Sequence, residues 1–306
     1  MKGVKQLEFI TAKEIAEKWK VSERMVRKYC TQGRIKDALL ENGIWYIPQG
    51  TRKPPREKKK EVEVEPVGLA RKVVYQRRKN NHFGIYEYIQ VNLAYSSSRM
   101  ASNRLTRKQV LEVYRTYRIT PAFEATKVDD IIEIVNHFIC VQHMVDQIMK
   151  PLTIALIQKF HALLTYGTFS DRQHKLGCGE FRSEPAKLGI PPNEIVQALT
   201  ALIREYERRP ADLQRVLEFH VRFEKIPPFE DYNGRVGRVI MVKECLRYEI
   251  DPFIIDDKHR GVYNRGIASW DTDPEILFST VEAAQERLRG QLEVCKLMEY
   301  HKPNHK

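Results

Sequence analysis

The sequence predicts a mainly α-helical protein made of a small N-terminal unit and a larger helical unit. After residue 68, apolar residues recur at helical spacing, and no alternating run there is long enough to form a sheet. A Pro- and charge-rich stretch at 51–66 separates the two parts, as a linker does. The first 60 residues hold 16 Lys or Arg against 7 Asp or Glu, so most of the formal net charge of +12 lies in the small unit. A chain of 306 residues can bury one sizeable core and a smaller second one.

Two short helices and a hairpin are expected in the small unit. The stretch TAKEIAEKWK opens with a capping box formed by Thr11 and Glu14. A second helix is predicted to begin at Ser22 as its N-cap and to end at Gly33. Only about three residues separate the helices, as a helix-turn-helix requires. Asn42 and Gly43, between two apolar runs, are a strong hairpin signal and predict a two-stranded wing.

This order of elements has a known counterpart. The stretch FITAKEIAEKWKVSERMVRKYCTQGRI, followed by NGIWYIP, resembles the winged helix-turn-helix of the excisionase and MerR-like families. The resemblance implies DNA binding, with the second helix in the major groove and the wing against the backbone. The residues expected to contact DNA are Ser22, Arg24, Arg27, Lys28 and Asn42. The alternative is a helix-turn-helix that docks another protein.

We expect four segments along the chain: a winged helix-turn-helix at 1–50, a linker at 51–67, a helical domain at 68–298 and a tail at 299–306. Within the helical domain, a short hairpin arm is expected where KLGIPP occupies 187–192. The predicted helices cover 68–95, 106–117, 128–148, 151–165, 193–208, 211–225, 235–248, 258–268 and 274–298.

Four segments of the helical domain together resemble the Fic (Fido) family. LEFHVRFEKIPPFEDYNGRVGR at 217–238 resembles the family signature, which usually reads His-Pro-Phe-x-Asp/Glu-Gly-Asn-Gly-Arg-x-x-Arg after a helix. GEFRSEPAKLG at 179–189 resembles the segment leading into the family's flap. SSSRMASNRLT at 96–106 resembles the segment with the inhibitory glutamate, and IIEIVNH at 131–137 falls between them. The resemblance implies an all-helical Fic domain with a small β-hairpin flap.

The resemblance also implies a chemistry: transfer of AMP from ATP, with Mg²⁺, to a hydroxyl of a target protein. Asp231 matches the family's metal-binding acid. Arg238 matches its second arginine, which is suited to bidentate phosphate contact. The residues that match the anion nest at the start of the following helix are Asn233, Gly234, Arg235 and Gly237.

The chain departs from the family pattern at three decisive places. Pro227 stands where the family has its catalytic His, and proline has no titratable side chain. Because general-base catalysis contributes typically about 10²- to 10⁴-fold, the usual adenylylation should be severely weakened. Tyr232 replaces the first Gly of the Gly-Asn-Gly, where a bulky ring could fill part of the nucleotide site. Ala101 and Ser102 replace the inhibitory Glu-Gly, so the family's carboxylate brake is missing.

No other residue is an obvious base. His220 is two helical turns before Pro227 and is interpreted as a packing or hydrogen-bonding residue, while Glu230 is interpreted as a solvated loop acid. Tyr263 and Asn264 fall where family members place groups near the nucleotide base, although an aromatic residue on a helix is more often core. The other histidines that occur singly on helical faces are interpreted as structural: His137, His143 and His259.

The leading hypothesis is a DNA-associated regulatory protein with a degenerate Fic domain, which can also form a homodimer. The first alternative is an active or residual Fic-type AMP transferase that uses ATP and Mg²⁺, and the second is a scaffold or partner of an active Fic enzyme. Five scattered cysteines form no metal-binding motif, and no stretch offers the roughly 20 apolar residues that span a bilayer. A soluble, cytoplasmic protein without membrane contact is therefore expected.

Overall fold

The chain forms two compact units, Met1–Glu63 and Val64–Lys306, and the division falls within the predicted linker. The computed structural model describes residues 8–55, 66–79, 84–120, 126–173, 177–187 and 189–300, with side chains as far as residue 293. Parts of the predicted linker and of the predicted tail, 56–65 and 301–306, lie outside the described residues.

The small unit contains the two helices and the hairpin that the sequence predicts. Its elements are β1 (Phe9–Thr11), α1 (Ala12–Trp19), α2 (Glu23–Thr31), β2 (Leu39–Glu41) and β3 (Ile44–Pro48). The strands form one antiparallel sheet in the order β1-β3-β2, with Ile10 opposite Ile47 and Leu40 opposite Trp45. Its core is built around the fully buried side chains of Ile15, Val26 and Ile47.

Local hydrogen bonds explain these elements. The capping box is formed, because the Glu14 N–H donates to Thr11 Oγ1 at 3.3 Å and the Thr11 N–H donates to Glu14 Oε2 at 2.7 Å. Asn42 and Gly43 have φ values of 48° and 80°, as a type I′ hairpin turn requires. Ser22 does occupy the N-cap of α2, but its hydroxyl makes no capping hydrogen bond, so that part of the prediction is wrong.

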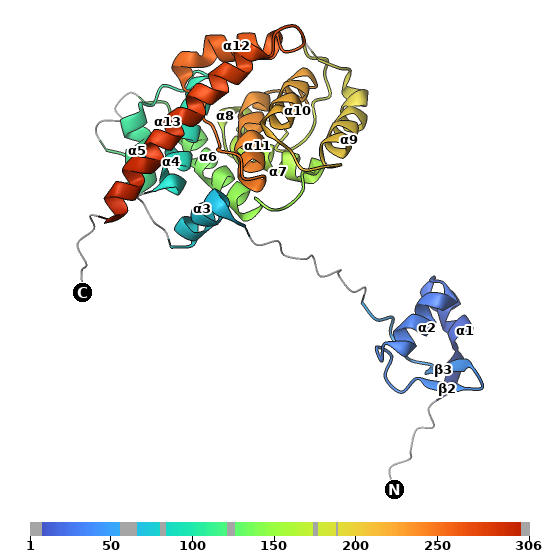
Figure 1. Ribbon diagram of the computed structural model, residues 1–306. Coiled ribbons are helices and arrows are strands. Elements are labelled where there is room, and N and C mark those ends of the chain that lie inside the picture. The colour runs from blue at the N-terminus through green and yellow to red at the C-terminus, as the bar shows by residue number, and fades with distance from the viewer. Residues whose placement is uncertain are drawn as a thin grey trace. The chain divides into compact units, whose positions relative to one another are not determined.

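The large unit is a helical assembly around α11 (Figure 1). Nearly every side chain of α11 from Arg235 to Leu246 is buried, and the helix packs against α4, α6, α7 and α10. Its elements are α3 (Gly68–Arg78), α4 (Ile85–Arg99), α5 (Arg107–Thr116), α6 (Val128–Asp146), α7 (Ile154–Thr165), α8 (Phe169–Arg172), η2 (Pro192–Glu194), α9 (Ile195–Tyr206), α10 (Leu213–Lys225), α11 (Asn233–Arg247), η3 (Asp257–His259), α12 (Arg260–Ala268) and α13 (Glu275–Tyr300).

Mainly helical architecture is thus confirmed, but one predicted helix is two. Residues 68–95 were expected to be continuous, whereas α3 ends at Arg78 and α4 begins at Ile85. The buried side chain of Gln76 accepts the Tyr86 N–H at 3.0 Å, so α3 supplies a partner for the first turn of α4. A Cβ at Gly84 would lie 2.5 Å from Gln76 Nε2, and this close approach explains why the second helix begins after glycine.

The expected hairpin arm at 187–192 has no paired strands among the described residues, whose three strands all lie between Phe9 and Pro48. Pro191 and Pro192 lack the N–H groups that a ladder needs. Instead, the Arg182 guanidinium donates to the carbonyl of Ile190 and folds the segment back. The flap is therefore an irregular loop in this structure.

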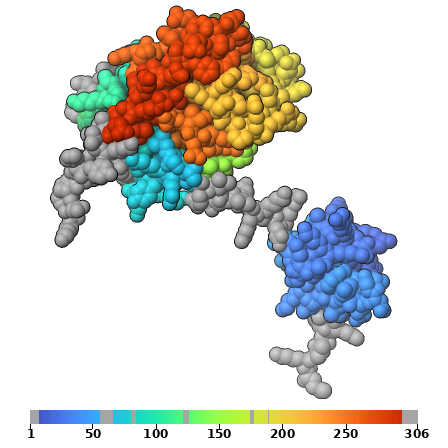
Figure 2. Space-filling model, in the orientation of Figure 1, coloured from blue at the N-terminus to red at the C-terminus, as the bar shows by residue number. Residues whose placement is uncertain are grey.

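The outer surface of the large unit is formed in part by α12 and α13, the orange and red segments in Figure 2. In the described part of the chain, no helix combines the length and apolar character needed to cross a membrane. Cys30, Cys140, Cys178 and Cys245 are free thiols.

Candidate functional site

The exposed side of α2 carries the cations expected to contact DNA. Arg24, Arg27 and Lys28 are exposed, while Val26 between them is buried. Arg27 is ion-paired with Glu23 at 2.6 Å, one turn earlier, which partly neutralises its charge. All three cations of this face are therefore exposed, and one of them, Arg27, is paired with an acid.

The wing is exposed as well. Asn42 lies at the tip of the β2–β3 hairpin, and Ser22 at the start of α2 is also exposed. All five residues predicted to contact DNA are thus at the surface of the small unit. Their contact with DNA remains a prediction.

In the large unit, the loop between α10 and α11 is closed by its own side chains. Asn233 Nδ2 donates to the Phe229 carbonyl at 2.8 Å, and Asn233 Oδ1 accepts the Phe229 N–H at 2.9 Å. Asp231 Oδ1 accepts the Tyr232 N–H at 2.6 Å. The Asn233 amide thus holds the turn before α11, and the N-cap residue of that helix, Tyr232, makes no side-chain capping hydrogen bond.

Tyr232 has a left-handed backbone at the N-cap of α11, with φ 64° and ψ 4°. This conformation favours glycine and costs a residue with a side chain about 1–2 kcal/mol. The Tyr232 hydroxyl donates to Glu133 Oε1 at 2.8 Å, and the side chain is buried. Burial raises the pKa of this phenol. Tyr232 thus has a backbone conformation that favours glycine, and its buried ring fills the space beside the start of α11.

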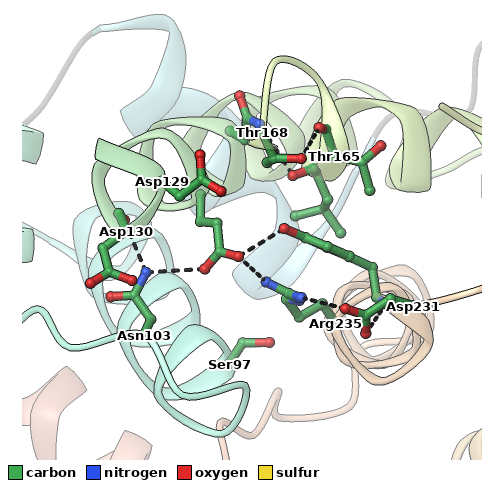
Figure 3. Close-up of polar contacts among 12 residues, drawn as sticks. Ser97, Asn103, Asp129, Asp130, Thr165, Thr168, Asp231 and Arg235 are labelled. Atoms are coloured by element: carbon green, nitrogen blue, oxygen red, sulfur yellow. Dashed lines mark hydrogen bonds and ion pairs between the residues drawn. The ribbon is translucent and has the colours of Figure 1, made fainter. Parts of the chain in front are cut away.

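A carboxylate from α6 is ion-paired with Arg235 (Figure 3). Glu133 Oε1 lies 3.0 Å from Arg235 Nη1, and Glu133 Oε2 accepts from Asn103 Nδ2 at 3.1 Å. The Arg235 guanidinium also stacks on Tyr232, 3.1 Å from the ring centroid, and is 5 % exposed. Its cationic side chain is therefore already paired and enclosed by protein groups.

Arg238 is likewise engaged within the protein. Its Nε donates to Ser97 Oγ at 2.9 Å and its Nη2 to the Ser97 carbonyl at 3.3 Å. A Cβ at Gly234 would lie 2.9 Å from Arg238 Nη1, so the guanidinium crosses the start of α11 at close range. Ala101 is exposed in the turn after α4, and the partner of Arg238 in this region is the hydroxyl and carbonyl of Ser97.

Pro227 lies under the flap. A Cβ at Gly189, where φ is 129°, would be 2.7 Å from Pro227 Cγ, so the two segments touch. Arg182, only 4 % exposed, donates from Nε to the Pro227 carbonyl at 2.8 Å. Its backbone N–H donates to the Pro228 carbonyl at 3.0 Å. The position that corresponds to the family base is thus in contact with the flap and partly buried.

Little space remains next to the arginines. The recess beside Arg238 has a cavity volume of about 0 Å³ and is lined in part by Ser96, Ser97 and Phe253. Pockets for small molecules and cofactors usually measure about 300–1,000 Å³. The recess is below that range.

The buried histidines near the site are neutral. Burial and the positive charge of Arg238 lower the pKa of His220 to about 3. His220 Nε2 lies 2.5 Å from the Tyr263 hydroxyl, so both side chains are occupied within the core. A Cβ at Gly237 would meet His220 Cε1 at 2.8 Å, which indicates that this glycine allows α10 and α11 to pack closely. Burial, with Arg235 and Arg238, likewise lowers the pKa of His137 to about 3.

The remaining candidates are one histidine on α6 and three exposed residues. His143 makes an edge-on contact with Phe160, with ring centroids 6.1 Å apart. Glu230, His259 and Asn264 are exposed.

Three residues that contact this site were not singled out from the sequence: Glu133, His161 and Arg182. His161 stacks on Phe229 with ring centroids 3.9 Å apart, and its Nδ1 accepts the Gly179 N–H at 3.0 Å. Burial lowers its pKa to about 4. Each of the three residues lies in a segment far from the loop in the sequence. A local motif therefore could not show that these side chains contact the loop.

Mg²⁺ and ATP are the ligands that the Fic resemblance implies. The Asp231 side chain is 67 % exposed, and its Oδ2 lies 3.7 Å from Arg235 Nη2. Mg²⁺ is commonly held by one or two carboxylates together with substrate phosphates, so Asp231 fits a metal ligand. Arg235 and Arg238 fit phosphate chemically, but their guanidinium groups contact Glu133 and Ser97 instead.

Comparison with known proteins agrees with this fold. Residues 151–245 match the Fic/DOC family model. No curated protein matches the sequence. A Fic-domain signalling protein from Bacteroides thetaiotaomicron is 16 % identical with a TM-score of 0.58, and the match covers 74 % of this chain and 95 % of that protein.

Two further solved structures are similar. Fic-1 from C. elegans matches with 14 % identity and a TM-score of 0.60, over 75 % of this chain and 72 % of that one. A Fic family protein from Desulfovibrio desulfuricans matches with 18 % identity and a TM-score of 0.52, over 77 % and 75 %. At these identities the likeness concerns the fold. The large unit of this chain therefore has the Fic fold, in agreement with the match of residues 151–245 to the Fic/DOC family model.

Proposed function

We propose that this chain is a DNA-associated regulatory protein whose Fic domain does not perform the usual protein adenylylation. The observation that carries the proposal is the closed loop at the start of α11. Pro227 lies beneath the flap, while Glu133 and Ser97 contact the two arginines that would bind phosphate. A domain in this state can serve as a scaffold or as a sensor that opens when a ligand displaces the internal carboxylate.

DNA association is supported by the surface of the small unit. Arg24 and Lys28 are exposed on the second helix of a helix-turn-helix arrangement, and Asn42 is exposed on its hairpin. Phosphate contacts made by such cations release counterions, so DNA affinity falls steeply with salt. The net positive charge of the first 60 residues acts in the same direction.

The test measures binding of the full chain to random-sequence duplex DNA between about 50 and 200 mM salt. Arg24→Ala with Lys28→Ala should weaken binding and lower the slope of log K against log salt by about 2. The matched control is Arg204→Ala with Arg209→Ala, which removes two exposed cations from the large unit. Absence of binding at low salt, or equal losses in both double variants, would refute DNA association through α2.

Residual AMP transfer is the second candidate, and the exposed carboxylate of Asp231 favours it. Phosphoryl-transfer transition states depend chiefly on positioning and electrostatics, so a missing base does not abolish every such reaction. Incubation of the full chain with labelled ATP, Mg²⁺ and cell lysate distinguishes the two functions. Label transfer that disappears in Asp231→Ala would favour the enzyme, and the regulatory proposal expects no transfer.

A further inference from the structure

The positive charge of the large unit is concentrated in its first three helices. Residues 66–118, which include α3, α4 and α5, hold 11 Lys or Arg against 2 Asp or Glu. This excess equals that of residues 1–60, whereas residues 119–306 hold 25 Lys or Arg against 28 Asp or Glu. A region with one sign of charge attracts a partner of the opposite sign, so this block is a candidate surface for a polyanion.

The C-terminal ends of α3 and α5 meet at the first turn of α4. Gln76, near the end of α3, accepts the Tyr86 N–H at 3.0 Å. Arg115, near the end of α5, is ion-paired with Glu87 at 2.7 Å. Two successive residues of α4 therefore hold both helix ends at one place. We call the exposed residues at these ends the α3–α5 corner, which consists of Tyr75, Arg78, Lys79, Tyr117 and Arg118.

One side of α3 carries an aromatic ring between two cations. Arg71, Tyr75 and Arg78 follow one another at spacings of four and three residues, so they fall within about 60° of one another around the helix. All three side chains are exposed, and Tyr75 is 61 % exposed. The buried residues of α3 lie on the opposite side of the helix. The core therefore does not use the Tyr75 ring.

The end of α5 presents a second exposed ring among cations. Tyr117 is the C-cap of α5 and has a left-handed backbone, with φ 52° and ψ 28°. Glycine and asparagine are the usual residues in that conformation at a helix end. The Tyr117 ring is 67 % exposed, so its burial does little to offset the backbone strain, and Arg115 and Arg118 beside it are exposed as well. Strain of this kind is typical of positions that serve a ligand.

The acids near the corner compensate only part of its charge. Glu87 is paired with Arg115, and Asp146 of α6 lies 2.6 Å from Arg77. Glu112, the second acid of residues 66–118, is partly exposed on α5. These few carboxylates cannot balance 11 cations, so the block remains strongly basic.

Cations together with exposed rings suit a single-stranded nucleic acid. Guanidinium and ammonium groups contact phosphates, and aromatic rings stack on bases that have no partner strand. Duplex DNA offers its phosphates to cations but keeps its bases stacked inside, so Tyr75 and Tyr117 would have no base to stack on. Cations in the last turn of a helix also balance the helix dipole, but that role needs no exposed ring beside them.

We propose that the α3–α5 corner binds single-stranded DNA. Tyr75 and Tyr117 stack on bases, while Arg78, Lys79 and Arg118 contact phosphates. The choice of DNA over RNA rests on the proposed association of the small unit with DNA. The corner includes no residue of α2 or of the loop before α11, so the chain has separate residues for duplex DNA and for an unpaired strand.

The first test measures binding of a labelled oligo(dT) of about 20 nucleotides to the full chain by fluorescence anisotropy at about 50 mM salt. Tyr117→Ala should weaken binding by about 5- to 150-fold, which is the effect of losing one stack between a base and a ring. Tyr117→Phe keeps a ring and should bind like wild type. The matched control Tyr166→Ala removes a ring that is 72 % exposed elsewhere on the large unit, and it should leave the affinity unchanged.

The second test concerns the phosphate contacts. Arg78→Ala with Lys79→Ala should lower the slope of log K against log salt by about 1.4, because each phosphate contact to a single strand contributes about 0.7. Arg204→Ala with Arg209→Ala removes two exposed cations from another part of the large unit and should leave the slope unchanged. All these positions are exposed, and circular dichroism with thermal unfolding checks that each variant folds.

The two DNA-binding proposals can fail separately. Arg24→Ala with Lys28→Ala should weaken binding of random-sequence duplex and keep binding of oligo(dT), while Tyr117→Ala should do the reverse. A wild type that binds oligo(dT) but no duplex would refute duplex binding by α2 and still support the corner. Absence of oligo(dT) binding, equal losses in Tyr117→Ala and Tyr166→Ala, or tighter binding of oligo(U) than of oligo(dT) would overturn the corner proposal.

Discussion

Replacing Glu133 with glutamine tests whether an internal carboxylate closes the Fic site. The substitution keeps the size of the side chain and a carbonyl oxygen for Tyr232 or Asn103, but it removes the negative charge beside Arg235. Arg235 is 5 % exposed, and its other acidic neighbour, Asp231, lies at 3.7 Å and is exposed to solvent. Removing one partner of a buried ion pair typically costs about 3–5 kcal/mol. Because Glu133 is 18 % exposed, we expect the lower end, about 3 kcal/mol.

The assay is thermal and denaturant unfolding of the full chain with and without Mg²⁺ and ATP. For a domain of this size, about 3 kcal/mol corresponds to a Tm decrease of about 6–12 °C. If the anion takes the place of the carboxylate, ATP at 100 times its Kd should return about 2.7 kcal/mol to Glu133→Gln. Wild type should show a clearly smaller shift, because Glu133 competes with phosphate for Arg235.

Two controls make the result specific. Glu112→Gln removes a carboxylate from α5, outside the site, and should change neither Tm nor the ATP response. Glu133→Gln/Arg235→Met removes the buried cation as well, so it should recover part of the stability and lose the ATP response. Equal stabilisation of wild type and Glu133→Gln by ATP would refute the idea that Glu133 occupies the phosphate position.

Further predictions concern the flap, the histidines and the missing base. Gly189→Ala should destabilise the domain by about 1–3 kcal/mol and speed proteolysis at Lys187, because the new Cβ would lie 2.7 Å from Pro227. The control Gly261→Ala places a Cβ where no atom lies within 4 Å, so it should be neutral or slightly stabilising. Equal effects of the two substitutions would contradict the close contact between Gly189 and Pro227. The pKa of His220 is about 3 in the folded protein, below its unfolded value of about 6.5. The free energy of unfolding is therefore highest above pH 6.5, and it decreases as the pH is lowered from about 6.5 to about 3. His220→Gln should reduce that slope, measured by urea unfolding, by about 1.4 kcal/mol per pH unit, and an unchanged slope would mean that His220 titrates normally. Pro227→His alone should give no self-labelling with ATP and Mg²⁺, whereas its combination with Tyr232→Gly and Glu133→Gln should label; labelling by the single variant would mean that the loop is open.

The helices of the large unit could be predicted because each buries one face with its own 3.6-residue period. Nearly every boundary was within a few residues, including α6, predicted at 128–148 and observed at Val128–Asp146. The break between α3 and α4 was missed because apolar spacing continues across it. Its cause is a contact between Gln76 and the first turn of α4, which periodicity does not encode.

From the sequence, the candidate site could be predicted only as a set of positions at which this chain differs from the Fic family motif. Pro227, Tyr232 and Ala101 are visible in the sequence as departures from a motif, and each position suggests loss of a function. The contacts that Glu133 makes at this site could not be predicted from the motif. Glu133 is about a hundred residues from Tyr232 in the chain, and it contacts Tyr232 only because α6 packs against α11. A carboxylate brake was expected to be missing, yet the structure brings a carboxylate to Arg235 from a different helix.

Tyr232 is therefore more than the loss of a glycine. Its backbone keeps the left-handed geometry at a cost of about 1–2 kcal/mol, while burial of a large side chain is worth about 1.5–3 kcal/mol. The ring also covers Arg235, and its hydroxyl binds the same carboxylate oxygen that pairs with this arginine. Ring, cation and carboxylate stabilise one another, so the arginine that would bind phosphate has become part of the buried structure. A return to glycine alone would remove the ring but leave Glu133 paired with Arg235, and for this reason opening the site requires a change on α6 as well as in the loop.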